Sequence, residues 1–272
     1  MLIDAIVTDL DDTLLNAQSV LSPYTLEVIN RAKAQGVRVI PASGRAAYSM
    51  RPFVEELDTG LPYIACNGAE LVNADHTVME TVAFAPEQAR EITRYLQSQG
   101  FYVQCYRGDT FYYDSECQAS VDYKRSSGMH GQAVGNLAEF ITFPTPKLLS
   151  VQTPDEVTRL YPLIQAAFPN ASFTVSKPYF LEAEPPSVNK GAALRRLADK
   201  LRLSPEHTLV FGDSLNDLTM LGYAVHSVAM GNARDEVKRA ARHVCGTNAE
   251  DGVARFIARN VLESPLIGSD NA

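Results

Sequence analysis

Apolar residues along the chain fall into short β-branched runs separated by segments of helical period, and this pattern predicts an α/β fold. The first run, LIDAIVT at residues 2–8, has the composition of a strand buried on both faces. Ser22 and Pro23 then predict the start of a helix, which ends at Gly36. Two further apolar runs flank a second predicted helix: residues 37–42, 45–57 and 62–66. This alternation of strands and helices predicts a parallel sheet with right-handed crossovers.

The pattern changes in the middle of the chain. Residues 68–82 contain two alternating stretches around an Asn-Ala-Asp-His turn, which predicts a hairpin. Residues 83–185 mix predicted strands and helices and hold most of the tyrosines and phenylalanines, as in a separate α+β domain. Strand–helix alternation then resumes. We therefore expect one α/β domain at residues 1–82 and 186–272, interrupted by an inserted α+β domain, and a polar tail after Leu262.

Polar residues follow four of the predicted strands of the α/β domain. They are Asp9, Asp11, Asp12 and Thr13, then Ser43, Gly44 and Arg45, then Asn67 and Gly68, and finally Asp213, Ser214, Asn216 and Asp217. In doubly wound sheets, ligands bind beyond the carboxyl ends of the strands. Acidic residues at strand ends also serve as turn formers and helix caps, but that interpretation does not account for the whole set.

Three of these carboxylates predict a metal site. Asp9 and Asp11 are two residues apart, and the fold would bring Asp213 close to them. Like charges at such distances raise one another's pKa values or require a cation. Mg²⁺ is the usual hard divalent ion where phosphates are handled.

Two further features are candidates for anion binding. Ser43 and Gly44 offer a hydroxyl and an open backbone N–H just before a predicted helix. Lys190 begins a predicted helix, where the helix dipole disfavours a lysine unless it serves an anion. Taken singly, the first is also explained as a helix cap and the second as a solvated surface lysine.

The order of these motifs is more specific than any one of them. DLDDTLL, SGR, NKG and GDSLND follow one another along the chain in an order that resembles the four-motif signature of the haloacid dehalogenase superfamily. The resemblance is closest to the Cof-like branch of Mg²⁺-dependent phosphatases. ACNGA, YFLEAEPPSVNKG and VAMGNA also match that branch. The resemblance spans the whole chain. It implies a Rossmann-like three-layer core with a parallel sheet, and an inserted α+β cap domain at residues 83–185 that sets substrate specificity.

The resemblance implies a catalytic role for two aspartates. Asp9 would be the nucleophile that forms an aspartyl-phosphate. Asp11 would protonate the leaving alcohol and later activate the hydrolytic water. The Mg²⁺ ligands would be the carboxylates of Asp9 and Asp213 and the backbone carbonyl of Asp11.

The resemblance also implies a set of phosphate-binding groups: the hydroxyl of Ser43, the backbone N–H groups of Leu10 and Gly44, and the side chains of Lys190 and Asn216. Asp217 would orient metal-bound water or Lys190, and Arg45 and Asn67 would support the site. Many relatives have glycine where this chain has Asp12 and threonine where it has Ser43. Serine keeps the hydroxyl, and the side chain of Asp12 is expected to point away from the metal.

The inserted domain is less informative. Tyr106, Arg107, Lys147 and Tyr179 could touch a leaving group, although a structural or surface role is favoured for each. Glu182 matches a family feature without a role that the sequence explains. The four cysteines have no CxxC spacing and are expected to be reduced packing residues.

Composition narrows the classes of function. The 272 residues are 46% hydrophobic and 21% charged, with a net charge of −8, as in an ordinary folded protein. An acidic chain lacks the basic surface that nucleic-acid binding needs. No run of about 18 apolar residues and no basic segment before an apolar core is present, so we expect a cytoplasmic protein without membrane association. Oligomeric state has no signature in the sequence.

Together these features predict a Mg²⁺-dependent phosphatase of small phosphorylated metabolites. Sugar phosphates are the first candidates, followed by cofactor phosphates such as flavin mononucleotide or pyridoxal phosphate. One alternative is a phosphotransferase or phosphomutase that uses the same intermediate. Others are a receiver-like signalling protein, although such domains are about half this length, and an inactive binding protein, although every catalytic position is filled.

Overall fold

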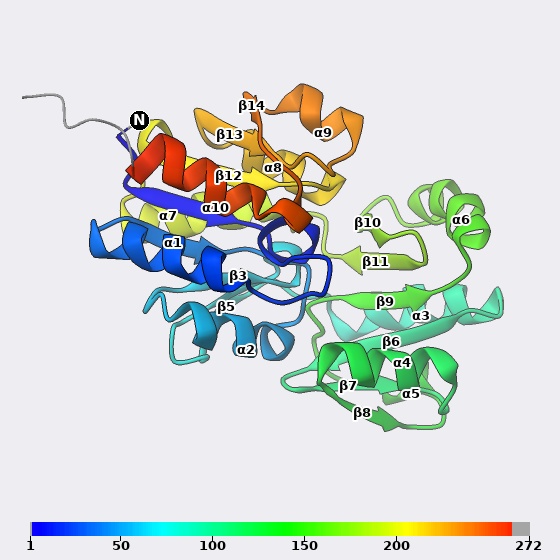
Figure 1. Cartoon of the computed structure of the whole chain (residues 1–272). Coiled ribbons are helices and arrows are strands. Elements are labelled where there is room, and N and C mark those ends of the chain that lie inside the picture. Colours follow the sequence, from blue (N-terminus) through cyan, green and yellow to red (C-terminus); the bar gives the residue numbers. More distant parts are fainter. Residues whose placement is uncertain (1, 263–272) are drawn as a thin grey trace, which may run out of the picture. The chain divides into compact units, whose positions relative to one another are not determined.

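The computed structural model describes residues 2–262, which divide into two compact units (Figure 1). The parallel-sheet unit holds the described chain up to residue 42, residues 53–61 and the chain from residue 194 onward. The mixed-sheet unit holds residues 43–52 and 62–193. The sequence predicts that residues 83–185 are inserted into the α/β domain. The division into compact units does not test this insertion, so its boundaries stay a prediction. The polar tail expected after Leu262 lies outside the described residues.

The parallel-sheet unit is built on five parallel strands in the order β14-β13-β12-β1-β2. Their bounds are Ala5–Thr8 (β1), Arg38–Pro41 (β2), Thr208–Gly212 (β12), His226–Ala229 (β13) and His243–Val244 (β14). All residues of β1 and β12 are buried, as expected for central strands made of apolar and β-branched residues. The predicted parallel α/β core is confirmed.

Helices complete this unit. They are α1 (Pro23–Ala34), α8 (Leu218–Leu221), α9 (Asp235–Ala240) and α10 (Gly252–Ile257), while α2 (Ala47–Leu57) and α7 (Lys190–Leu201) have turns in both units. The predicted start of α1 is confirmed, because the Ser22 Oγ accepts the backbone N–H of Thr25 at 2.9 Å. Helices α1 and α10 contact each other, which ties the two ends of the described chain together.

The mixed-sheet unit contains a six-stranded sheet in the order β10-β11-β9-β6-β7-β8. Its strands are β6 (Tyr102–Arg107), β7 (Thr110–Tyr113), β8 (His130–Ala133), β9 (Leu148–Val151), β10 (Ser172–Lys177) and β11 (Phe180–Glu184). All neighbours are antiparallel except β7 and β8. Its helices are α3 (Pro86–Ser98), α4 (Gln118–Ser127), α5 (Leu137–Phe140) and α6 (Pro154–Ala167).

Strand alternation divides this sheet between two apolar clusters. In β6, Val103 and Cys105 join a cluster with residues of α3, α5 and α6. Tyr106 instead joins a second cluster that includes Tyr123 of α4. Because neighbouring residues of a strand point to opposite faces, one strand supplies both clusters. The predicted α+β character of this segment is confirmed.

The third predicted strand differs from expectation. Instead of joining the parallel sheet, β3 (Tyr63–Ala65) forms a three-stranded antiparallel sheet with β4 (Glu70–Val72) and β5 (Val78–Thr81). The reason lies directly after β3, where Cys66 and Asn67 have left-handed φ angles of 50° and 53° that turn the chain back into β4. The predicted β4–β5 hairpin is confirmed, with its turn closed by the Asn73 N–H to the Thr77 carbonyl.

All four cysteines are free thiols, as expected. Cys66 and Cys105 are buried packing residues, whereas Cys117 is exposed and therefore departs from the expectation. Among residues 2–262, no helix combines the length and the apolar character needed to span a bilayer.

Candidate active site

The first predicted motif forms a buried turn at the end of β1. Asp9 is only 5% exposed, and its backbone N–H donates to the Phe211 carbonyl of β12 at 3.1 Å. The following turn closes with the Leu15 N–H donating to the Leu10 carbonyl at 2.8 Å, and both leucines are buried. These leucines anchor the turn in the core, which holds Asp9 at the strand end.

Asp12 occupies a special backbone position in this turn. Its φ is +58°, in the left-handed region that glycine adopts at no cost and that aspartate tolerates better than most residues. This explains why glycine is acceptable at the position. The side chain is exposed, and the backbone carbonyl accepts the side-chain N–H of Asn232 at 2.7 Å.

The second half of the carboxylate cluster follows β12. Asp217 is completely buried, and its Oδ2 accepts the backbone N–H groups of Asp213 and Ser214, each at 2.9 Å. A Cβ at Gly212 would lie 2.5 Å from the Asp217 Cβ, so only glycine fits there. The Asp213 Oδ1 accepts the Thr13 hydroxyl at 2.8 Å, which links this loop to the turn after β1.

These contacts gather three acids in the parallel-sheet unit. One ligand atom each of Asp9, Asp213 and Asp217 lies within 4.8 Å of the other two. A cluster of carboxylate oxygens suits a hard divalent cation, so these residues could hold a metal ion. The structure brings together Asp9 and Asp213 as the sequence predicts. Asp217 joins them, whereas the Asp11 side chain is outside the group.

Two predicted phosphate-binding residues also belong to this unit. The Leu10 side chain is fully buried in the core, and the predicted phosphate-binding group of this residue is its backbone N–H. Asn216 is half-buried in the short turn Leu215–Asp217 that precedes α8. Both are neighbours in sequence of the clustered acids.

The Ser43–Gly44–Arg45 loop belongs to the mixed-sheet unit. The backbone N–H of Ser43 donates to the Ile64 carbonyl at 2.9 Å, and the Ser43 carbonyl accepts the Asn67 N–H at 3.0 Å. The Ser43 Oγ accepts the Arg45 backbone N–H at 3.1 Å. Ser43 is 1% exposed, so the hydroxyl is held in place rather than free in solvent.

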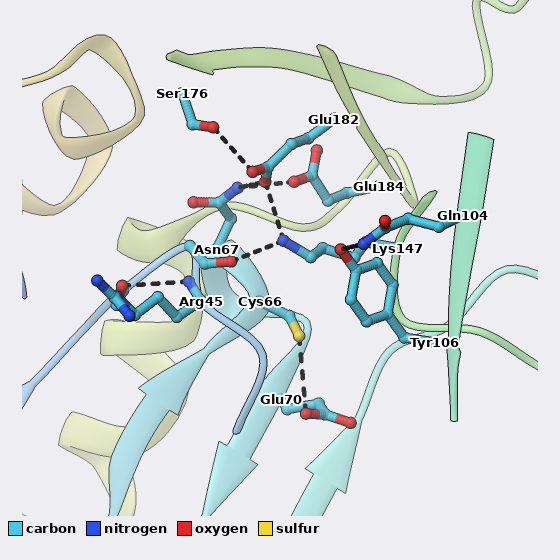
Figure 2. A network of polar contacts seen from close by, with 12 residues as sticks. Arg45, Cys66, Asn67, Glu70, Gln104, Tyr106, Lys147, Ser176, Glu182 and Glu184 are labelled. Carbon is cyan, nitrogen blue, oxygen red and sulfur yellow. Dashed lines mark hydrogen bonds and ion pairs between the residues drawn. The ribbon is translucent and has the colours of Figure 1, made fainter. Parts of the chain in front are cut away.

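Gly44 is required by close packing against Asn67. A Cβ at Gly44 would lie 2.8 Å from the Asn67 Oδ1. The Asn67 Nδ2 donates to the Glu182 Oε2 at 2.8 Å and to the Glu184 Oε1 at 2.7 Å (Figure 2). Asn67, expected as a supporting residue, therefore links this loop to strand β11.

Lys147 lies beside the same loop. It is 1% exposed and precedes β9, and its Nζ donates to the Gly44 carbonyl at 2.8 Å and pairs with the Glu182 Oε2 at 3.3 Å (Figure 2). Burial lowers the pKa of a lysine, but the Glu182 carboxylate and weaker neighbours outweigh it, and the pKa of Lys147 is raised. Lys147 therefore carries a full positive charge inside the unit.

Glu184 completes this polar cluster as a different kind of acid. It is 1% exposed, and burial raises its pKa well above the ordinary value of 4.5, as does the charge of Glu182, while Asn67 and Lys147 act in the opposite direction. Burial and the charge of Glu182 both favour the protonated form of Glu184. Within the same cluster, Lys147 and Glu182 pair with each other.

Lys190 lies elsewhere in the mixed-sheet unit, at the first position of α7 as predicted. It is 1% exposed, so it is not the solvated surface lysine of the alternative interpretation. The preceding Asn189 caps the helix through its Oδ1, which accepts the Ala192 N–H at 2.7 Å. Gly68, with φ +100°, packs against Asn189 so closely that a Cβ would lie 2.5 Å from its carbonyl oxygen.

The other candidate residues of the inserted segment pack against, or hydrogen-bond to, neighbouring side chains. The Tyr106 hydroxyl is buried between Gln104 and Tyr123. The Arg107 guanidinium stacks on the Phe143 ring at 5.0 Å, and Tyr179 packs edge-on against Phe180. The sequence did not single out Glu184, and it assigned no contacts to Lys147 or Glu182.

With the motifs placed, comparison with known proteins identifies the family. The sequence pattern of the haloacid dehalogenase-like hydrolases matches residues 6–257. The chain belongs to this family. A crystal structure of a haloacid dehalogenase-like hydrolase from Bacteroides thetaiotaomicron aligns with a TM-score of 0.85 and 29% identity, covering 94% of this chain and 99% of that one.

The names of two relatives state the compounds on which those enzymes act. One is 5-amino-6-(5-phospho-D-ribitylamino)uracil phosphatase YwtE of Bacillus subtilis, 31% identical over 93% of this chain and 96% of its own length. The other is pyridoxal phosphate phosphatase YbhA of Escherichia coli, 27% identical over 94% of this chain and 98% of its own length. The protein is a phosphatase of the haloacid dehalogenase superfamily, which confirms the predicted family and enzyme class.

Proposed function

We propose that this phosphatase hydrolyses phosphate monoesters of small metabolites with Mg²⁺ as its cofactor. The observation that carries the proposal is the group formed by Asp9, Asp213 and Asp217, whose ligand atoms lie within 4.8 Å of one another. Oxygen-only donors at this spacing suit Mg²⁺. Bound there, the ion would neutralise charge on the phosphoryl group and the acids.

The proposed reaction has two steps. A carboxylate oxygen of Asp9 attacks phosphorus, and the bond to the ester oxygen breaks as Asp11 gives a proton to the departing alcohol. Asp11 then takes a proton from water, which attacks the same phosphorus and releases phosphate and free Asp9. The buried position of Asp9, with its backbone anchored on β12, supports its role as a fixed nucleophile.

The proposed phosphate-binding groups suit their role in each unit. Ser43 presents a hydroxyl whose oxygen already accepts a backbone N–H, and Lys190 is a buried cation at a helix start. The Leu10 N–H, the Gly44 N–H and Asn216 complete the proposed set. Asp217 supports the loop after β12, and Arg45 and Asn67 support the loop that holds Ser43.

The proposed substrates are phosphorylated metabolites rather than phosphoproteins. The names of the two relatives give a phosphorylated ribityl compound and pyridoxal phosphate as their substrates, and both are small molecules. Sugar phosphates remain the first candidates, followed by cofactor phosphates. The free thiols agree with a cytoplasmic location, which we propose together with this substrate class.

The proposal is tested by hydrolysis of p-nitrophenyl phosphate and a panel of phosphorylated metabolites with and without Mg²⁺. We expect Mg²⁺-dependent release of phosphate that is lost in Asp9→Asn. Asp12→Asn makes the same chemical change on an exposed side chain of the same turn and is expected to keep wild-type activity. Activity of Asp9→Asn at the wild-type level would contradict the proposal. Transfer of phosphate to a second sugar hydroxyl in place of free phosphate would indicate a phosphotransferase.

A further inference from the structure

Lys147 contacts the Ser43–Gly44–Arg45 loop and Glu182 contacts Lys147, although neither residue belongs to the four motifs of the reaction. Lys147 precedes β9, and Glu182 lies in β11, opposite Leu149 of β9. Both are buried, with exposed fractions of 1% and 4%. A buried ion pair costs desolvation and is weak evidence for a stabilising role by itself. The contacts of this pair indicate what it does.

Lys147 acts on a single peptide group, the one between Gly44 and Arg45. Its ammonium donates to the carbonyl oxygen of that peptide at 2.8 Å. The N–H of the same peptide points the opposite way, as in any trans peptide, and donates to the Ser43 Oγ at 3.1 Å. A cation on the carbonyl oxygen polarises the peptide and strengthens its N–H as a donor.

This bond determines what the Ser43 hydroxyl can do. A serine hydroxyl has one proton to donate and two lone pairs that accept. Since the Arg45 N–H occupies a lone pair of Oγ, the hydroxyl proton is directed away from that peptide. It is therefore available to donate to an anion such as a phosphoryl oxygen.

Glu182 fixes Lys147 in this position. Its Oε2 accepts both Lys147 and the Asn67 Nδ2, and its Oε1 accepts the Ser176 hydroxyl at 2.8 Å (Figure 2). Asn67 in turn presents its Oδ1 to Gly44, so that a Cβ there would lie 2.8 Å away. The loop thus accepts hydrogen bonds from Lys147 at the Gly44 carbonyl and from the Asn67 N–H at the Ser43 carbonyl, and Glu182 binds both of these residues.

We propose that Lys147 and Glu182 are positioning residues that hold the Ser43–Gly44–Arg45 loop in its phosphate-binding conformation. The six-stranded sheet, whose segment was expected to select the leaving group, then also shapes the recognition of phosphate. This inference rests on the proposed function, in which Ser43 and Gly44 bind the phosphoryl group.

The test compares Lys147→Met, Lys147→Arg and Glu182→Gln with wild type. Two readouts are measured in Mg²⁺: kcat and KM for p-nitrophenyl phosphate, and direct binding of inorganic phosphate by calorimetry. We expect Lys147→Met to weaken phosphate binding by roughly 10-fold and to lower kcat/KM by roughly 10–100-fold. Lys147→Arg should recover part of both losses, and Glu182→Gln should lose less than Lys147→Met.

Tyr106→Phe is the matched control. It removes the buried hydroxyl that bonds to Gln104 and Tyr123 but keeps the ring, whose centroid lies 5.2 Å from the Lys147 Nζ. It should lower the melting temperature and leave phosphate binding and kcat/KM unchanged. The double variant Lys147→Met/Ser43→Ala provides a second criterion. If Lys147 acts through this loop, the double variant loses less than the two single variants' losses combined.

Additive losses in the double variant, or phosphate binding within twofold of wild type in folded Lys147→Met, would overturn the inference. If Lys147→Met does not fold, Glu182→Gln and Lys147→Arg decide by the same readouts. A wild-type protein that binds phosphate through these residues but hydrolyses no ester would refute the proposed function while leaving the inference intact.

Discussion

The two polar clusters of this molecule use buried charge in opposite ways. In the parallel-sheet unit, three carboxylates lie within 4.8 Å of one another. In the mixed-sheet unit, Lys147 pairs with Glu182, and burial raises the pKa of Glu184 well above its ordinary value. Carboxylates gathered so closely favour a bound cation, whereas the second cluster contains a cation of its own, Lys147. The first cluster could therefore hold a metal ion, whereas the second contacts a loop through the bond from Lys147 to the Gly44 carbonyl.

The largest expected effect is on the first cluster. Asp213→Asn removes one negative charge from the group but keeps an oxygen that can accept the Thr13 hydroxyl. We expect kcat/KM to fall by about 10²–10³-fold, with a higher Mg²⁺ concentration needed for half-maximal activity. A Mg²⁺ titration of activity measures both, with Asp12→Asn as the control. An unchanged Mg²⁺ requirement would remove Asp213 from the metal site.

The second cluster should respond mainly in stability. Lys147→Met leaves the buried Glu182 without its cation, and we expect a loss of about 3–5 kcal/mol in the free energy of unfolding. Tyr106→Phe, which removes neutral hydrogen bonds, should cost about 1 kcal/mol. Urea unfolding monitored by circular dichroism measures both. Adding Glu182→Gln to Lys147→Met should recover part of the loss, and a further loss would contradict the charge balance.

A smaller effect is expected at the point where the second cluster contacts the loop. Gly44→Ala places a Cβ 2.8 Å from the Asn67 Oδ1, so Asn67 or the loop must shift. We expect kcat/KM to fall by roughly 10-fold or more with little change in melting temperature. Gly222→Ala, whose Cβ would have 3.4 Å to the Leu218 carbonyl oxygen, is the control. Equal kinetics for the two variants would show that the close packing at Gly44 does not matter.

The smallest expected effect is the pH dependence of stability from Glu184. Burial raises the pKa of this carboxyl in the folded protein, so the folded state binds more protons than the unfolded state at pH values between 4.5 and the raised pKa. The contribution of Glu184 is therefore fully present below pH 4.5 and is lost as the pH rises through the raised pKa. Glu184→Gln has no carboxyl to titrate at this position. The melting temperature of the variant relative to wild type should therefore rise as the pH rises. A constant difference between the two proteins from pH 5 to 9 would contradict the raised pKa of Glu184.

Much of the fold could be predicted because its strongest signals are local. The apolar run of β1 and the Ser22 cap of α1 need only a few neighbouring residues to be recognised. β8, with the sequence HGQA and mostly exposed residues, has no such pattern and was not predicted. The path of β3 was mispredicted because it depends on the left-handed conformation of Cys66, which a propensity argument does not anticipate.

The residues of the candidate site also differ in how far local sequence predicts them. Asp9 and Asp213 were recognised because each directly follows an apolar strand, and family resemblance supplied their roles. Lys147 was named only as a residue that could touch a leaving group, with a structural or surface role favoured. Its contacts were not predicted, since its partners Gly44 and Glu182 are 103 and 35 residues away in the sequence. A charge whose partner comes from distant sequence has no local signature, and only the folded structure reveals it.

In the proposed reaction, Asp9 carries the phosphoryl group during turnover. Asp11→Asn should trap it there, because the variant cannot activate water, while p-nitrophenol leaves without needing a proton. After rapid quenching of this variant with p-nitrophenyl phosphate and Mg²⁺, peptide mass spectrometry should find one phosphoryl group on Asp9. A phosphoryl group on another residue, or turnover without any phosphorylated enzyme, would contradict the role of Asp9 as the nucleophile.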